Sequence, residues 1–247
     1  MDSLRVQDWI VAVILAFLVG QALTRPRFAR QASLEGIEDP EAARAYDRVS
    51  RTPQFRLIRR MVARELRRLK PESPIVDVGC GPGYLVAVLA REFPDEQIIG
   101  VDLSEEMTQV AAANMAALGL GRTRFVRGDA AGLPFADGSV GFIVSTLSLH
   151  HWSDPAAVFR EFHRALKPGG RFLVFDVRRD ALNLFYWLFA FARRVFLPKG
   201  LRRLNEPTGS ALASYVPSEI EEMMEASPFT EWMVRRGAFW TMTIGRK

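Results

Sequence analysis

Short, continuously apolar segments alternate with helical patterns through the central part of the chain, and this alternation constrains the fold more than any other feature. Strand-like segments are expected at 75–79, 97–101, 123–126, 140–146 and 171–177. Helical patterns near 83–92, 105–118 and 154–166 separate most of them. Strands that are apolar throughout are typical of a parallel sheet that helices cover on both faces. The pattern predicts a doubly wound α/β fold.

Both ends of this core carry further elements. A helix is expected from Pro53, and a β-hairpin at 229–235 and 239–245 after a helix at 217–226. We expect one domain over 53–247, with an apolar insertion at 180–216. Residues 31–52 are predicted to form a linker and lid, and residues 1–30 an N-terminal membrane anchor.

The composition excludes several classes of protein. With 49% apolar and 25% charged residues among 247, the chain is not disordered. Its single cysteine, Cys80, excludes a disulfide framework and a cysteine-based zinc cluster, and no His, Asp or Glu spacing suggests a metal site. The net charge of +5 would suit nucleic acid or an anionic membrane, so the positions of the arginines must decide.

The N-terminal segment Trp9 to Leu23 has no charge and one polar side chain, Gln21. Three interpretations remain open: a membrane anchor that spans the bilayer or lies in its interface, a cleaved signal peptide, and a buried core helix. The anchor is favoured because acidic residues precede the segment and Arg25, Arg27 and Arg30 follow it. By the positive-inside rule, those arginines place the rest of the chain in the cytoplasm.

Two further regions carry unusual charge or apolarity. The helix after Pro53 has arginines at six positions between 56 and 68, which form a solvated face, a lipid-facing surface or, least favoured, an RNA-binding face. The block 182–197 holds five aromatic residues within seven and is followed by arginines. It is either a covered core helix or the lid of an acceptor pocket that also dips into lipid. We therefore expect a membrane partner rather than nucleic acid.

A glycine loop follows the first predicted strand and precedes a helix, reading Gly79-Cys80-Gly81-Pro82-Gly83. Glycines at such a turn let the backbone approach a ligand, and the helix start offers free N–H groups. Asp102 ends the next strand, where a carboxylate can accept both ribose hydroxyls of a nucleoside. Tyr84 stands where the dinucleotide fingerprint requires Gly or Ala, which argues against NAD.

Four ordered segments, VDVGCGPG, GVDLS, RGDAAGLPF and the LKPGG turn, together resemble the class I S-adenosylmethionine-dependent methyltransferases over residues 74–177. The resemblance implies a Rossmann-like, seven-stranded, mostly parallel sheet whose C-terminal hairpin supplies an antiparallel strand. It also implies S-adenosylmethionine as cofactor. Gly79, Gly81 and Gly83 would line its methionine part, and Asp77 would orient its ammonium group. Gly79 and Gly83 could instead serve the turn alone, and Cys80 is expected to be only a small residue.

The same resemblance assigns the nucleoside. Asp102 would hold the ribose, and Leu103 and Met107 would pack on the adenine. Asp129, next to Ala130, would accept a hydrogen bond from the adenine amine. The structural alternatives are a helix cap for Asp102 and a turn residue for Asp129.

Acceptor contacts are expected beyond the carboxyl ends of the strands, where open α/β folds bind ligands. His150 is the first candidate for the acceptor or its proton, and His151 the second, although both could only cap the loop. His163 lies within a helix and is expected to be structural or solvated. Tyr46, with Asp47, resembles the tyrosine-containing lid of many small-molecule methyltransferases and could close over the cofactor.

The LPF run from Leu133 and the HHW loop look most like the quinone C-methyltransferases and the bacterial phosphatidylethanolamine N-methyltransferases. The expected activity is therefore methyl transfer to a hydrophobic, lipid-like acceptor at the cytoplasmic surface of a membrane. Three alternatives stay open: a soluble small-molecule methyltransferase, an RNA methyltransferase, and a non-catalytic assembly or lipid-binding protein that keeps the fold. The oligomeric state is not predicted.

Overall fold

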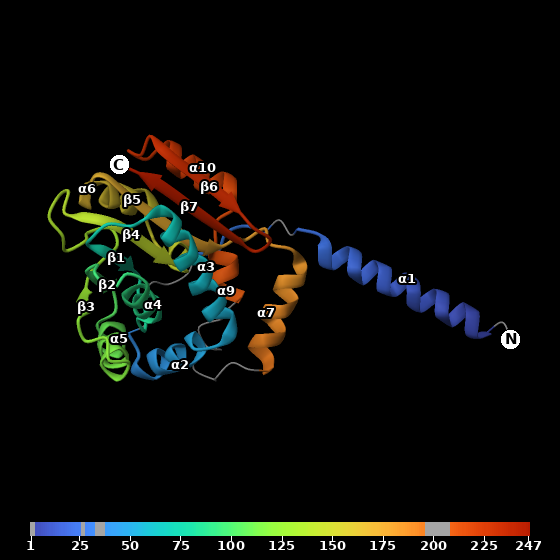
Figure 1. The fold of residues 1–247 in the computed structure, drawn as a ribbon. Helices are drawn as coiled ribbons and strands as arrows, with labels where there is room; N and C mark the ends of the chain where they lie inside the picture. The colour runs from blue at the N-terminus through green and yellow to red at the C-terminus, as the bar shows by residue number, and fades with distance from the viewer. Residues whose placement is uncertain (1–2, 26–27, 33–37, 196–207) are drawn as a thin grey trace.

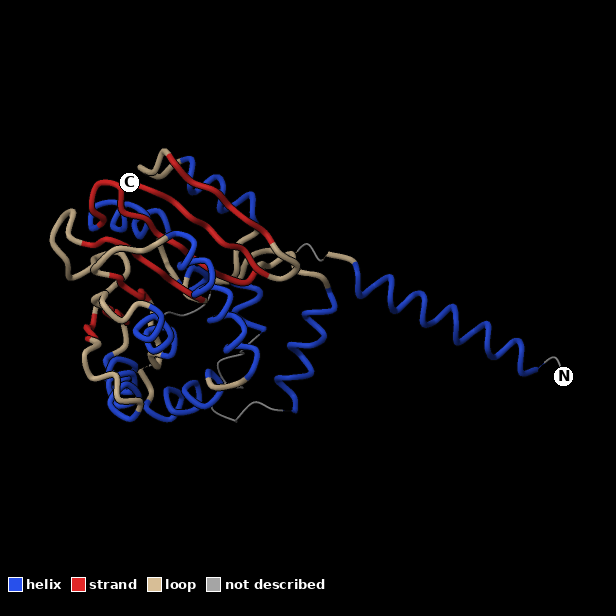
Figure 2. Tube along the Cα trace, viewed as in Figure 1, coloured by secondary structure: helices blue, strands red, loops and turns tan. Residues whose placement is uncertain are grey.

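The computed structural model describes residues 3–25, 28–32, 38–195 and 208–247. Its centre is a seven-stranded sheet in the order β3-β2-β1-β4-β5-β7-β6 (Figure 2). The strands are β1 Ile75–Val78, β2 Ile98–Asp102, β3 Arg124–Arg127, β4 Val140–Thr146, β5 Leu166–Val177, β6 Glu231–Arg236 and β7 Trp240–Arg246. The first five pair in parallel, and β7 runs antiparallel to both β5 and β6. The predicted doubly wound, Rossmann-like sheet with an antiparallel C-terminal strand is confirmed.

Helices cover both faces of this sheet (Figure 1). One face packs against α3 (Pro53–Leu69), α4 (Tyr84–Glu92) and α5 (Glu105–Ala117). The other packs against α6 (Pro155–Ala165) and α10 (Pro217–Glu225). All four residues of β1 are buried, as a strand between two helical layers requires. The continuously apolar strands therefore predicted this layering correctly.

Most strand boundaries differ from the sequence prediction by one or two residues at most, and the start of β5 differs by more. The LKPGG segment was expected as a turn before a strand at 171–177, but β5 begins at Leu166, which pairs with Val140. The register of β4 and β5 then shifts, and Gly169 adopts a positive φ of 79°. The Pro-Gly-Gly sequence is thus accommodated as an irregularity within a paired strand instead of ending it.

The remaining helices lie outside the two layers. They are α1 (Ser3–Leu23), α2 (Pro40–Ser50), α7 (Asn183–Val195), α9 (Thr208–Ala213) and the short 3-10 helix η1 (Leu149–His151). The α1 helix projects away from the body, and α7 starts beside its inner end (Figure 1). Residues 33–37 of the predicted linker and 196–207 of the predicted apolar insertion lie outside the described residues.

The side chains of α1 that the structure describes are exposed on all sides of the helix, including Trp9, Phe17 and Leu23. They do not enter the core, so the buried-helix alternative for residues 9–23 is wrong. Within the described ranges, no helix combines the length and the apolar character needed to span a membrane.

Candidate active site

The glycine loop joins β1 to α4 and turns tightly. Gly79, Gly81 and Gly83 have φ values of 73°, 49° and 80°, a region that side-chain-bearing residues rarely adopt. A Cβ atom on Gly79 would also collide with the side chain of Ser148, which precedes η1. The loop therefore needs glycine for its conformation and, at Gly79, for its close approach to the segment after β4.

Asp102 ends β2 and faces this loop. Its Oδ2 accepts a hydrogen bond from the Gly81 backbone N–H at 2.8 Å, and its Oδ1 accepts one from the Ser104 N–H at 3.0 Å. Burial raises the pKa of Asp102, although these N–H donors favour its charged form. The carboxylate thus links the glycine loop to the start of α5, where the Ser104 side chain accepts from the Met107 N–H.

Asp77 lies within β1 and is 1% exposed. Neither of its carboxylate oxygens has a hydrogen-bond partner in the described part of the chain. Burial, and next the nearby Asp102 charge, raise the pKa of Asp77 to about 8. A buried carboxylate without a donor is costly unless a ligand supplies one, so this residue fits a cationic group bound at the glycine loop.

The α2 helix lies over the loop. The Tyr46 ring comes within 3.5 Å of the position that a Cβ on Gly81 would occupy. Asp47 is buried beside it, with Oδ1 accepting from the Tyr84 hydroxyl at 2.8 Å and from Asn114 Nδ2 at 2.9 Å. Its Oδ2 accepts from the Arg51 guanidinium at 2.7 Å. The Asp47 carboxylate therefore connects α2 to the start of α4 and to the C-terminal part of α5, the two helices beside the glycine loop.

The nucleoside candidates are arranged less uniformly. Met107 is buried and Leu103 half-buried near the carboxyl end of β2. Asp129 is exposed after β3, and its Oδ1 accepts from the Ala131 N–H at 2.8 Å, as a turn residue does. Ala130 packs against the hydrophobic core beneath α6. The ribose and adenine contacts assigned to these residues remain predictions.

The histidine pair occupies η1 at the carboxyl end of β4. His150 is buried, and its Nδ1 lies 2.8 Å and 2.9 Å from the two carboxylate oxygens of Asp176, near the end of β5. The same carboxylate accepts from the His150 backbone N–H at 3.0 Å. His151 is half-buried, with its ring centroid 4.1 Å from that of His150. The structure thus adds Asp176 to the site.

Two other residues behave as the sequence predicted. His163 on α6 packs edge-on against Phe229, and burial lowers its pKa. Burial raises the pKa of the Cys80 thiol well above its ordinary value, so the thiolate that a nucleophile requires is disfavoured. Neither residue joins the groups at the carboxyl edge of β4 and β5.

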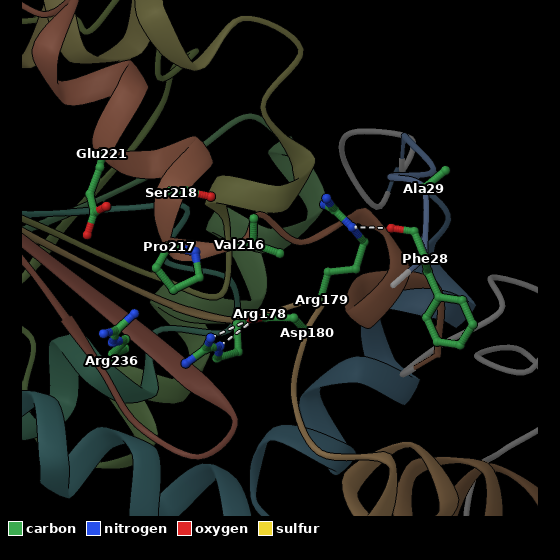
Figure 3. A pocket seen from close by; sticks show the side chains of 10 residues that line it. All are labelled: Phe28, Ala29, Arg178, Arg179, Asp180, Val216, Pro217, Ser218, Glu221 and Arg236. Carbon is green, nitrogen blue, oxygen red and sulfur yellow. Dashed lines mark hydrogen bonds and ion pairs between the residues drawn. The ribbon is translucent and has the colours of Figure 1, made fainter. Parts of the chain in front are cut away.

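A cavity of about 420 Å³ opens beyond the ends of β5 and β6 (Figure 3). None of the glycine-loop residues lines it. Its buried guanidinium groups are matched by carboxylates: Arg178 binds Asp180 through two bonds of 2.6 Å, and Arg179 binds Glu219 at 2.6 Å. Arg179 also donates to the Phe28 carbonyl at 2.8 Å. This cluster fixes the segment after α1 onto the domain.

The site therefore combines groups that the sequence identified with two that it did not assign. The structure brings together the loop glycines, Asp77, Asp102 and Tyr46. The two histidines follow β4, which lies beside β1 in the sheet. The bridging role of Asp47 was missed because its partners are 37 and 67 residues away. Asp176 did carry a signal, since it is the one acid in β5 and follows directly after the apolar residues 172–175.

Comparisons with known proteins agree with this geometry. Residues 76–174 match the methyltransferase domain family. The demethylmenaquinone methyltransferase of Geobacillus kaustophilus is 29% identical and aligns over 78% of this chain and 87% of its own length. The malonyl-[acyl-carrier protein] O-methyltransferase 1 of Coxiella burnetii is 33% identical, over 62% of this chain and 50% of its own.

Solved structures show the same fold. A protein described as an S-adenosylmethionine-dependent methyltransferase from Methanococcus maripaludis has a TM-score of 0.64 and 26% identity, and the match covers 86% of this chain and 95% of that one. An Aquifex aeolicus methyltransferase, 19% identical with a TM-score of 0.59 over 84% and 98% of the two chains, supports the fold alone. Together with the glycine loop, its acidic partners and the family match, these similarities establish that the chain is a class I S-adenosylmethionine-dependent methyltransferase.

Proposed function

We propose that this enzyme methylates a hydrophobic, lipid-like acceptor at the cytoplasmic surface of a membrane, with a quinone ring as the first candidate and a phospholipid headgroup as the second. The observation that carries the proposal is the exposed apolar helix α1, whose inner end lies beside the segment that leaves the carboxyl edge of the sheet. The similarity to demethylmenaquinone methyltransferases supports the choice of a quinone.

The exposed surface of α1 is more apolar than that of a typical helix on the surface of a water-soluble domain. Between Trp9 and Leu23, the described apolar side chains are mostly exposed, with Trp9 at 74% and Phe17 at 63%. A helix that is apolar all round needs a non-aqueous environment or a covering protein. Arg25 is exposed directly after α1, and the positive-inside rule then favours a cytoplasmic position for the domain.

The residues at the glycine loop fit S-adenosylmethionine. The unpartnered carboxylate of Asp77 would hold its ammonium group, the glycine backbone would lie along its methionine part, and Asp102 would accept the ribose hydroxyls. Tyr46 would cover the site from α2. The bound cofactor supplies a methyl group that is already activated, so the protein's main task is to position the acceptor in line with it.

A quinone-type acceptor also loses a ring proton when its carbon bonds to the methyl group. His150 is the proposed base. An Nδ1–H donated to Asp176 would leave Nε2 as the basic ring nitrogen, and the carboxylate would stabilise the imidazolium that forms. Asp176 is a positioning residue in this scheme because it acts through His150.

Incubation of the protein with methyl-labelled cofactor and a membrane lipid extract, followed by mass spectrometry, tests the acceptor. A labelled quinone supports the first candidate, and a labelled phospholipid amine supports the second. Label found only in water-soluble products, or in acyl-carrier-protein esters, contradicts the lipid-like acceptor.

The base is tested separately. His150→Ala is expected to lower kcat by about 100-fold, the usual size of a general-base contribution, with little change in cofactor affinity. His163→Ala, in α6, is the matched control and keeps wild-type turnover. In Asp176→Asn, kcat should fall as well, because the His150 ring loses the carboxylate that orients it and would stabilise its imidazolium form. Full activity in His150→Ala would remove this residue from the mechanism.

A further inference from the structure

The α7 helix carries an exposed apolar stripe. Leu184, Trp187, Leu188 and Phe191 follow the spacing i, i+3, i+4, i+7, which places them on one face of a helix. They are 39%, 46%, 51% and 59% exposed, respectively. A contiguous row of large apolar side chains at the surface marks an interaction site more often than chance exposure does.

The opposite face of α7 is held firmly by the domain. The Phe185 ring packs on Phe239 with centroids 5.0 Å apart, and the Tyr186 ring meets Phe28 edge-on at 5.4 Å. The Tyr186 hydroxyl donates to the Arg179 carbonyl at 2.6 Å. These contacts fix the rotation of the helix, so the stripe faces outward. Its exposure disagrees with the alternative in which α7 is a covered core helix.

The start of α7 is hydrogen-bonded to the inner end of α1. Asn183 begins α7 and donates through its backbone N–H to the Thr24 carbonyl at 2.9 Å. Its Nδ2 donates to the Thr24 hydroxyl at 2.8 Å and to the Gln21 carbonyl at 3.2 Å. The two helices therefore diverge from one junction, as Figure 1 shows.

The charges around the stripe indicate what covers it. No acidic residue occurs in α7, and exposed arginines stand near both ends, Arg25 at the junction and Arg194 in the last turn. Two copies of the stripe would bring like charges together, whereas an anionic bilayer offers apolar chains beneath negative headgroups. The chemistry fits a lipid surface better than a second copy of this chain.

We infer that α7 is a second membrane-contacting element, which lies in the headgroup region of an anionic bilayer and buries Leu184, Trp187, Leu188 and Phe191 in its acyl boundary. This inference rests on the proposed action at a membrane and adds the orientation of the domain. Since α7 follows the carboxyl end of β5, its contact would turn the acceptor side of the sheet toward the bilayer.

Fluorescence quenching by brominated lipid tests the position of the stripe in the full-length chain. Vesicles of phosphatidylcholine with about one-third phosphatidylglycerol should quench wild-type emission more than emission from Trp187→Phe, which keeps the stripe apolar. The other four tryptophans, Trp9, Trp152, Trp232 and Trp240, provide the same background in both proteins. Equal quenching of the two proteins would overturn the inference, as would emission that depends on protein concentration but not on lipid.

Binding to the same vesicles gives a second measurement. The double variant Trp187→Ser/Phe191→Ser is expected to lower the partition coefficient by about tenfold or more, because each large apolar side chain contributes strongly to burial in lipid. Leu118→Ser/Met233→Ser removes two exposed apolar side chains outside the stripe and should bind as the wild type does. Equal binding by both double variants would contradict the inference.

Methylation of detergent-dispersed quinone separates this inference from the proposed function. The stripe variant should retain that activity while losing activity on quinone embedded in vesicles. If the wild type methylates no quinone but Trp187 is still quenched by lipid, the proposed acceptor is wrong and the docking surface stands.

Discussion

Apolar side chains are buried in the cofactor region but largely exposed on the described parts of α1 and α7. In β1, β4 and the helices above them, residues such as Val76, Ile143 and Leu89 are fully buried. In α1 and α7, Trp9, Phe17 and Phe191 are more than half exposed. Burial in the sheet stabilises the domain by itself, at about 25 cal/mol per Å² of apolar surface removed from water. The exposed apolar surface of α1 and α7 is not covered by the parts of the chain that the structure describes, so it lacks this stabilisation there.

This difference separates cofactor binding from the proposed membrane contact. The polar groups that would bind the cofactor lie among buried strands, where the carboxyl group of Asp77 has no hydrogen-bond partner among the described residues. The groups that would meet a membrane lie on the outward faces of α1 and α7 and are exposed. A substitution in the cofactor region should therefore leave vesicle binding largely intact, and a substitution in α1 or α7 should leave cofactor binding largely intact.

The largest effect is expected for Asp102→Ala. The change removes the acceptor for the Gly81 N–H and for the proposed ribose hydroxyls, and hydrogen bonds to a charged group are each worth about 1.5–3 kcal/mol. Cofactor affinity should fall by about 100-fold in calorimetry, while vesicle binding stays at the wild-type level. Unchanged affinity would refute the ribose role, and a parallel loss of vesicle binding would refute the independence of the two regions.

A smaller effect, with a pH signature, is expected for Asp77→Asn. Loss of one charge-assisted contact to the cofactor ammonium should weaken binding by about tenfold. Because the pKa of Asp77 is raised to about 8 from 3.8, the folded protein keeps a proton that the unfolded chain releases between these values. Its contribution to stability therefore decreases as the pH rises from 3.8 to about 8.

Thermal unfolding and calorimetry across that pH range check both parts. Without cofactor, Asp77→Asn should be more stable than the wild type at pH 8, since it removes a buried charge. Wild-type cofactor affinity should rise toward pH 8, and this rise should be absent in the variant. A variant that is less stable at pH 8 and binds cofactor normally would exclude the proposed role.

The smallest effect is expected for Asp47→Asn, which weakens the attachment of α2 to Tyr84, Asn114 and Arg51. The KM for the cofactor should rise by about fivefold, with a smaller change in kcat, because α2 would cover the glycine loop less persistently. Glu41→Gln, an exposed acid on the same helix, is the control. Equal kinetics in the two variants would show that α2 does not act as a lid.

The fold was predictable because its signals are local. Continuously apolar runs such as residues 98–101 indicate buried parallel strands, and glycines between a strand and a helix indicate a ligand loop. The start of β5 was missed because Pro168-Gly169-Gly170 normally ends a strand, whereas pairing with β4 carries the backbone through it. Tertiary pairing overrode local preference there.

The site was predictable only in part for the same reason. The loop glycines and Asp102 belong to contiguous motifs. The contacts of Asp47 and Asp176, in contrast, are made across 26 to 67 residues and depend on how helices pack on the sheet. No periodicity reports such distances. The exposure of α1 and α7 likewise follows from packing, although their composition showed that they differ from the rest.

The junction of Asn183 with Gln21 and Thr24 has a mechanical consequence. Three hydrogen bonds clamp the inner end of α1 to the start of α7, and Arg25 adds a fourth to the Asp180 carbonyl at 2.7 Å. These bonds join α1 to the domain more firmly than a flexible linker would. If α1 is held in a bilayer, the carboxyl edge of the sheet would keep a fixed distance from the membrane and a fixed orientation. The enzyme would then reach its substrate by lateral diffusion in two dimensions.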